Sequence, residues 1–351
     1  MPTSRRPIVL SRYLALAWCG LVVYGSLHPF SGWRDTGASP IAFLEGGWPR
    51  YWTVFDLVSN VVVYLPLGFF LVLAMHRLPG RFTALVLAVL LGGGLSFGME
   101  TVQTWLPSRV PSNLDLVCNT LGTLLGALWG HVVGPRIFAR LSELEHRLIA
   151  QVPHAELGLT LLGLWLLVQL SPETLLFGTG DLRQLLGLPG AVPFAAESFV
   201  LIEAAITAFN AVAVGLIVRL LCAQLAAAYL VVPIFFLAAL AVSAIAAAIL
   251  VNPAEAFAWL TPGARLGLIV GGVALLPAMA LPALARTMIA CLALVMGLVL
   301  VNLAPHNPYS LAALAVWRQG HFLNFNGLTR LVSTLWPFLT LPFLLLTLRR
   351  T

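Results

Sequence analysis

Residues 57–76 read Leu-Val-Ser-Asn-Val-Val-Val-Tyr-Leu-Pro-Leu-Gly-Phe-Phe-Leu-Val-Leu-Ala-Met-His, and this apolar stretch decides the fold. It contains no Asp, Glu, Lys or Arg. A helix rises about 1.5 Å per residue, so a stretch of this length can cross roughly 30 Å of hydrocarbon. Comparable stretches recur on both sides of it. The sequence therefore predicts a membrane protein that crosses the bilayer several times.

Ten transmembrane helices are predicted from such stretches. They are residues 8–27, 57–76, 83–106, 113–133, 157–176, 199–220, 225–250, 266–285, 287–304 and 331–348. The run 266–303 is too long for one crossing, so we divide it at Arg286 and accept a short ninth helix; a re-entrant hairpin is the alternative. The expected fold class is all-α, a polytopic helical bundle.

The composition excludes a soluble globule and a nucleic-acid-binding protein. Apolar residues make up 60% of the chain and charged residues 9%, which leaves too little polar surface to cover a soluble fold. All basic residues are arginines, and they occur singly or in pairs between apolar stretches rather than in a basic patch. The four cysteines lie inside apolar stretches, where they act as small apolar side chains.

The distribution of arginines predicts the orientation, because cytoplasmic loops carry an excess of positive charge. With a cytoplasmic N-terminus, twelve arginines fall on the inner side and seven on the outer side. Most of the outer arginines lie in long loops, which influence orientation little. Ten crossings then place the C-terminus in the cytoplasm as well.

The stretch 135–156 divides the chain. Arg136, Arg140, Glu143 and Arg147 follow one another at helical spacing, and leucines and an isoleucine follow a parallel stripe. This pattern is typical of a helix at the cytoplasmic membrane surface, and a soluble linker helix has much the same pattern. We therefore predict a four-helix domain in residues 1–134, an amphipathic linker helix in 135–156 and a six-helix domain in 157–351.

A short internal repeat occurs in the first domain. Asp56-Leu-Val-Ser-Asn60 opens the second predicted helix, and Asp115-Leu-Val-Cys-Asn119 opens the fourth. Both segments lie where the chain enters the membrane from the predicted outer side. The domain is thus interpreted as two helical hairpins related by a pseudo-twofold axis along the membrane normal.

Seven polar residues fall in the outer third of this domain, and we take them as candidate ligand-binding residues. They are Asp56, Asn60, Glu100, Gln103, Arg109, Asp115 and Asn119. Structural roles are the alternative: aspartates cap helices, asparagines join helices by hydrogen bonds, and Glu100 forms an ion pair with Arg109. Buried carboxylates in membranes more often mark function, and Gly68, Gly122 and Gly126 would let the helices approach closely.

The same residues carry a resemblance to the VanZ-like membrane proteins, over roughly residues 20–130. The matching run is Glu100-x2-Gln103-x5-Arg109-x5-Asp115-x3-Asn119-x2-Gly122-x3-Gly126, preceded by Tyr24-Gly-Ser-Leu-His-Pro-Phe30 and by Asp56-x3-Asn60-x5-Pro66-x-Gly68. The resemblance implies a four-helix VanZ-like domain in a bacterial envelope, and a multi-pass protein of the cytoplasmic membrane. The founding member is associated with resistance to the glycopeptide teicoplanin.

Our leading functional hypothesis is the binding or reorganisation of an amphiphile at the outer leaflet, either a cell-wall precursor or a lipoglycopeptide. Membrane lipids are the other expected partners. An enzyme acting on a lipid-linked substrate is a second hypothesis, although the sequence offers no recognisable nucleophile, metal or phosphate-binding motif, and catalytic residues stay unassigned. A transporter is a third, but polar positions do not continue through the membrane. We expect no cofactor and no bound metal.

Overall fold

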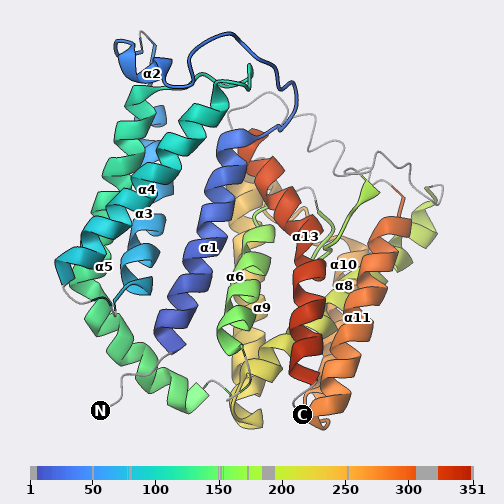
Figure 1. Ribbon diagram of the computed structural model, residues 1–351. Coiled ribbons are helices and arrows are strands. Elements are labelled where there is room, and N and C mark those ends of the chain that lie inside the picture. The colour runs from blue at the N-terminus through green and yellow to red at the C-terminus, as the bar shows by residue number, and fades with distance from the viewer. Residues whose placement is uncertain are drawn as a thin grey trace. The chain divides into compact units, whose positions relative to one another are not determined.

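A computed structural model describes residues 6–49, 51–76, 78, 81–148, 150, 152, 154–171, 174–183, 194–250, 253–305 and 323–348. Every regular element of these residues is a helix (Figure 1). Among the described residues, eight helices are long and apolar enough to cross a membrane. They are α1 (Arg6–Leu27), α3 (Val54–Ala74), α4 (Arg81–Gln103), α5 (Asn113–Leu148), α8 (Ala196–Leu221), α9 (Leu225–Leu250), α11 (Ala283–Leu303) and α13 (Leu323–Leu348). The prediction of an all-α polytopic protein is confirmed.

The two remaining predicted spans coincide with shorter apolar helices, α6 (Ala155–Val168) and α10 (Pro262–Ala278). The predicted division of 266–303 at Arg286 is wrong in position. The chain turns at residues 279–282, because Pro282 cannot donate a backbone hydrogen bond to a continuing helix. Consequently α10 is the short helix of the pair and α11 the long one, the reverse of our expectation.

The chain divides into two compact units, residues 1–144 and 145–351, which we call unit 1 and unit 2. Unit 1 contains α1, the short α2 (Ala42–Glu45), α3, α4 and most of α5. The structure has one continuous helix, α5, from Asn113 to Leu148, where the sequence suggested that a separate linker helix begins at residue 135. Side chains 138–149, including most of the expected amphipathic stripe, lie outside the described residues.

Glycines bring α3 and α5 into backbone contact. A Cβ atom on Gly122 would overlap the carbonyl of Val61, and one on Gly126 would overlap the carbonyl of Leu65. Gly68 faces the backbone of Thr123 in the same way. Lipid provides little hydrophobic drive for helix association, so close packing of this kind supplies much of the attraction. The expectation that these three glycines allow close approach is confirmed.

The contacts between glycines and backbone also fix the register of this helix pair. Residues 61 and 65 of α3 meet residues 122 and 126 of α5, and residue 68 meets residue 123, so the two helices run parallel with contacting residues 55 to 61 positions apart. The repeated segments beginning at Asp56 and Asp115 are separated by a number of positions within this range. They therefore lie at the same level, at the entrance of two neighbouring helices.

Unit 2 is built around α8. Glycines 263, 267 and 271 form a row on α10, and a Cβ atom on each would press into the Val200–Ala211 face of α8. The core contains Trp165 and Trp336, both fully buried, and the Trp336 indole donates to the carbonyl of Leu161 at 2.7 Å. The predicted span 157–176 is only partly helical, because α6 ends at Val168.

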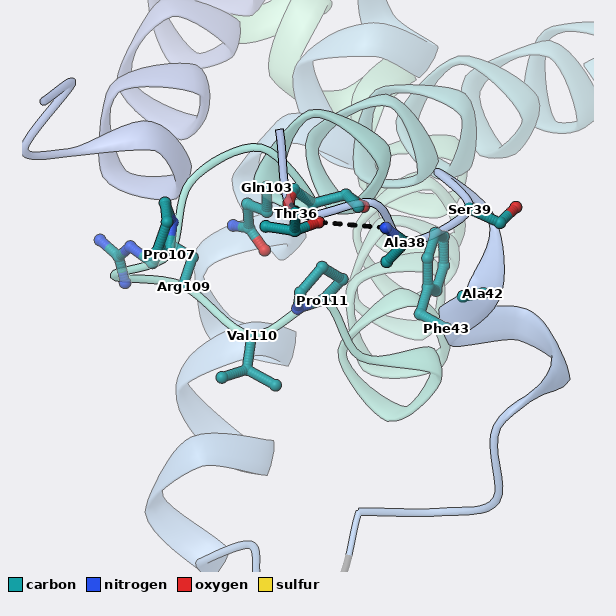
Figure 2. Close-up of a pocket in the computed structure, with 11 residues that line it drawn as sticks. Thr36, Ala38, Ser39, Ala42, Phe43, Gln103, Pro107, Arg109, Val110 and Pro111 are labelled. Carbon is teal, nitrogen blue, oxygen red and sulfur yellow. Dashed lines mark hydrogen bonds between the residues drawn. The ribbon is translucent and has the colours of Figure 1, made fainter. Parts of the chain in front are cut away.

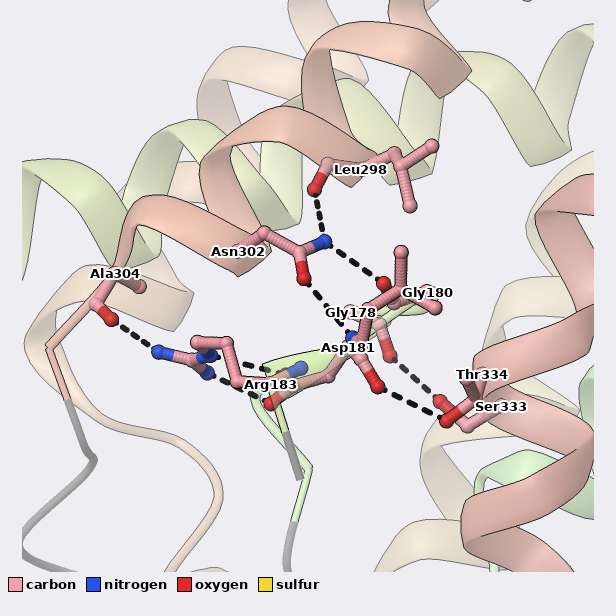
Figure 3. A network of polar contacts seen from close by, with 10 residues as sticks. Gly178, Gly180, Asp181, Arg183, Leu298, Asn302, Ala304, Ser333 and Thr334 are labelled. Carbon is pink, nitrogen blue, oxygen red and sulfur yellow. Dashed lines mark hydrogen bonds and ion pairs between the residues drawn. The ribbon is translucent and has the colours of Figure 1, made fainter. Parts of the chain in front are cut away.

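Residues 176–180 form an irregular buried segment within unit 2. Asn302 of α11 donates to the Gly180 carbonyl at 2.8 Å and accepts from the Leu182 amide at 2.9 Å (Figure 3). The Gly180 amide donates to the carbonyl of Ser333 on α13 at 2.9 Å. Irregular backbone is tolerated at membrane depth only where its polar groups are satisfied by protein or water. Here the neighbouring helices supply the partners.

An ion pair completes this network. Arg183 contacts Asp181 at 2.7 Å, and its guanidinium also donates to the carbonyl of Ala304, at the end of α11 (Figure 3). The Asp181 carbonyl accepts from the Thr334 hydroxyl at 3.0 Å. These contacts join the irregular segment to α11 and α13.

Candidate functional site

The candidate site lies at one end of unit 1, formed by residues 28–53 and 104–112, which we call the mouth. Hydrogen bonds join its two segments. The Arg34 amide donates to the Trp105 carbonyl at 3.0 Å, and the Thr36 hydroxyl donates to the Thr104 carbonyl at 3.2 Å. The Asn113 amide group donates to the Gly46 carbonyl at 2.9 Å. The long first loop is therefore fixed on the short second loop.

Arg109 and Gln103 both bind the end of α1. Arg109 donates to the carbonyls of Gly25 and His28 at 2.9 and 3.1 Å, and Gln103 donates to the Ser26 carbonyl at 2.9 Å. Carbonyls at a helix C-terminus lack intrahelical partners and carry partial negative charge, so a guanidinium is well suited to them. Burial lowers the pKa of Arg109, although an arginine stays charged at any physiological pH.

Glu100 does not form the ion pair with Arg109 that we considered from the sequence. Both residues lie in the described part of the chain, and Arg109 uses α1 carbonyls instead. Glu100 is 3% exposed, and its Oε2 accepts from the Ser112 amide at 2.8 Å. This bond fixes the last residue of the mouth before α5. Ser112 was not a predicted site residue, because the contact uses its backbone.

Capping accounts for Asp56. The Thr53 hydroxyl and the Asp56 carboxylate form a capping box, with the Thr53 amide donating to Asp56 at 2.9 Å and the Asp56 amide donating to Thr53 at 3.1 Å. Asp115 does not cap α5, since the Ser112 hydroxyl accepts from the amides of Leu114 and Asp115. The capping interpretation is thus right for Asp56 and wrong for Asp115.

The structure brings Asp56, Asn60 and Asp115 together at the entrance of α3 and α5. Asn60 faces the Asp115 carboxylate, and the charges of Asp56 and Asp115 interact. Glu100 also interacts electrostatically with Asp115. Three acidic residues from three helices therefore gather behind the mouth, and this concentration of like charge is costly without a partner or water.

Asn119 lies deeper, in a buried polar cluster that the sequence analysis missed in part. It donates to the Ser96 hydroxyl at 2.9 Å, and its own Oδ1 has no partner among the described residues. The Tyr64 hydroxyl lies near Ser96 and Ser26, also without a hydrogen bond of normal geometry to a described residue. Helical spacing could have identified both added residues. Ser96 precedes Glu100 by one turn, and Tyr64 follows Asn60 by one turn.

A pocket of about 380 Å³ opens between the two segments of the mouth. Gln103 and Arg109 line it, whereas the other five predicted residues lie outside its lining in the described part of the chain. The rest of the lining is Thr36, Ala38, Ser39, Ala42, Phe43, Thr104, Pro107, Val110 and Pro111. Figure 2 shows Arg109 at one edge of the pocket and Phe43 at the opposite edge, with Gln103, Thr36 and Pro111 between them.

Sequence comparison agrees with this architecture. Residues 12–134 match the sequence model of the VanZ/LLP1 family, a range that covers α1, α3, α4, the membrane-crossing part of α5 and the whole mouth. No curated protein and no solved structure matches the chain. With eight helices able to cross a membrane among its described residues, the chain is a multi-pass membrane protein that carries a VanZ-like domain in residues 12–134.

Proposed function

We propose that the mouth of unit 1 binds the head group of an amphiphile in the outer leaflet of a bacterial cytoplasmic membrane, either a cell-wall precursor or a lipoglycopeptide such as teicoplanin. The pocket of about 380 Å³ is the observation that carries this proposal. Its volume lies within the range of small-molecule sites, and its lining combines apolar surface with a few convergent polar groups.

The lining offers two kinds of contact. Arg109 contributes a positive charge, and its Nη1 forms no hydrogen bond to a described residue, whereas its Nε and Nη2 are occupied by α1 carbonyls. An anionic or carbonyl-rich head group can bind such a donor strongly. Phe43, Val110 and Pro111 provide apolar surface for the less polar part of the ligand.

The loop that covers the pocket is rich in exposed aromatic side chains. Trp33, Trp48, Tyr51 and Trp52 are all exposed, and Tyr51 is 94% exposed. Tryptophan and tyrosine favour the boundary between lipid and water. A loop held at this boundary would place the pocket where an amphiphile keeps its head group, with its tail still in the bilayer.

Two acidic residues, the buried Glu100 and the exposed Asp56, have a supporting role in this proposal. Glu100 orients residue 112, Asp56 caps α3, and Arg109 and Gln103 join the second loop to α1. A binding site requires such support, because a lining that moves by about an ångström loses affinity. These residues form the framework on which the pocket is built.

Binding of teicoplanin to the purified full chain in nanodiscs tests the proposal. Val110 lines the pocket and is 84% exposed, so Val110→Trp fills the pocket without disturbing a packed core. Val54 is 69% exposed at the start of α3 and does not line the pocket, so Val54→Trp is the matched control. We expect Val110→Trp to weaken binding about tenfold or more, and Val54→Trp to leave it unchanged.

The teicoplanin core without its acyl chain is the ligand control. It should bind more weakly than the intact molecule, since each buried methylene contributes about 0.8 kcal/mol. Equal binding of teicoplanin to both tryptophan variants and to the unaltered chain would show that the pocket is not the binding site.

A further inference from the structure

Two arginines converge at the turn between α10 and α11 in unit 2. Arg219 occupies the last turn of α8, and its Nε donates to the Met279 carbonyl at 3.2 Å. Arg286 occupies the first turn of α11, and its Nη1 donates to the same carbonyl at 3.3 Å. Two like charges thus share a single neutral acceptor. The arginine distribution predicts that this end of unit 2 faces the cytoplasm.

No acidic residue in the described part of the chain forms an ion pair with either arginine. The Asp181–Arg183 pair is the ion pair found among the described residues of the chain, and it involves neither Arg219 nor Arg286. Arg219 also donates to the Cys222 carbonyl at 3.0 Å, whereas the Nε of Arg286 is buried and has no described partner. The Met279 carbonyl can accept both hydrogen bonds, but it carries no negative charge and so does not compensate two guanidinium groups held side by side.

The N-terminus of α11 adds further donors at the same turn. Pro282 precedes the helix and provides no side-chain cap, and Ala283, Leu284 and Ala285 carry no acceptor that could serve instead. The first amides of a helix lack intrahelical partners and attract anions, phosphate above all. Guanidinium groups and free helix amides therefore meet at one place.

We propose that Arg219, Arg286 and the first turn of α11 bind the phosphate of an anionic phospholipid in the predicted cytoplasmic leaflet. Apolar side chains beside the turn favour a lipid over a soluble anion. Leu276, Leu284 and Met288 are each more than half exposed and provide a surface for acyl chains. An arginine presents a planar set of donors that suits a phosphate. This site belongs to unit 2 and does not depend on the mouth of unit 1.

Lipid retention by the full chain, measured by native mass spectrometry with phosphatidylglycerol and with phosphatidylcholine, tests the site. We expect phosphatidylglycerol to be retained preferentially, and Arg219→Gln/Arg286→Gln to reduce its affinity about tenfold or more. Arg265 is an exposed arginine near the other end of α10, so Arg265→Gln is the matched control and should bind like the unaltered chain.

A conservative variant and a soluble anion are tested alongside the double variant. Arg286→Lys keeps the charge and removes the planar set of donors, so it should fold and bind phosphatidylglycerol with intermediate affinity even if the double variant unfolds. Thermal protection by inorganic phosphate alone, lost in the arginine variants, would support the anion site but identify its ligand as soluble. Equal retention of both lipids, or unchanged retention in a folded double variant and in Arg286→Lys, would overturn the proposal.

Discussion

The two units use buried polar groups in opposite ways. In unit 1 the polar residues gather at one end, and two of them, Gln103 and Arg109, line an open pocket. In unit 2 the irregular segment 176–180 is buried, and α11 and α13 supply partners for its backbone. Buried polar groups in a membrane protein thus mark a candidate site only where they also border open space.

The largest expected effect concerns the helix packing on which unit 1 depends. Gly126→Ala places a Cβ atom against the Leu65 carbonyl and should destabilise unit 1 by about 3 kcal/mol, because neither backbone can yield. A Cβ atom added to Gly94 would meet open space, so Gly94→Ala should leave the stability unchanged or slightly raised. Thermal unfolding followed by tryptophan fluorescence measures both. Equal midpoints for the two variants would contradict the glycine-packed pair.

The next effect separates the two units. Asn302→Leu leaves the Gly180 carbonyl and the Leu182 amide without their partner, and should destabilise unit 2 by about 2 kcal/mol. Teicoplanin binding at the mouth should persist, because the two sets of contacts are independent. Ser243→Ala, which removes a hydroxyl bonded only within its own helix, is the control for stability. Loss of binding in folded Asn302→Leu protein would contradict this separation.

A third comparison tests whether Glu100 acts as a framework or as a reacting group. Glu100→Gln keeps an oxygen that can accept from the Ser112 amide, whereas Glu100→Leu leaves that buried amide unsatisfied. We expect binding to survive in the glutamine variant and the leucine variant to lose about 2 kcal/mol of stability. Assays with a lipid-linked precursor would detect catalysis. A covalent product formed by the unaltered chain and abolished by Glu100→Gln would favour an enzyme.

The smallest effect concerns the edge of the mouth. Thr53→Ala removes the hydroxyl of the capping box at the start of α3 and should cost about 1 kcal/mol. Ser39 is exposed and lies outside this cap, so Ser39→Ala should be neutral. Chemical denaturation of the two variants in the same detergent gives the difference. An unchanged stability of Thr53→Ala would show that the capping box of Thr53 and Asp56 does not stabilise α3.

Much of the fold could be predicted from the sequence, because apolar length determines where a chain can cross a bilayer. The errors occurred where that signal is weak. The predicted span 157–176 includes Gln169, Pro172 and Glu173 near its end; its helix ends at Val168, and the described residues 176–180 form irregular buried backbone. Distant partners such as Thr207, Asn302 and Ser333 make such backbone tolerable, and apolar content does not reveal them.

The site was predicted in its residue types rather than in its contacts. Gln103 and Arg109 line the pocket, but both also bind backbone carbonyls of α1, and Glu100 binds a backbone amide. Any residue offers such backbone groups, so side-chain patterns do not identify these partners. The glycine row at 263, 267 and 271 was visible in the sequence as a four-residue repeat and could have predicted the packing of α10 on α8.

The most direct test of the central claim is photocrosslinking from the mouth. A photoreactive amino acid at position 110 should capture acylated teicoplanin from a nanodisc, and excess unlabelled teicoplanin should prevent the reaction, because Val110 lines the pocket. The same probe at position 54, the first residue of α3 and outside the pocket, should capture little. Equal labelling at both positions, insensitive to competitor, would show that the ligand is merely dissolved in the bilayer and would contradict a binding site at the mouth.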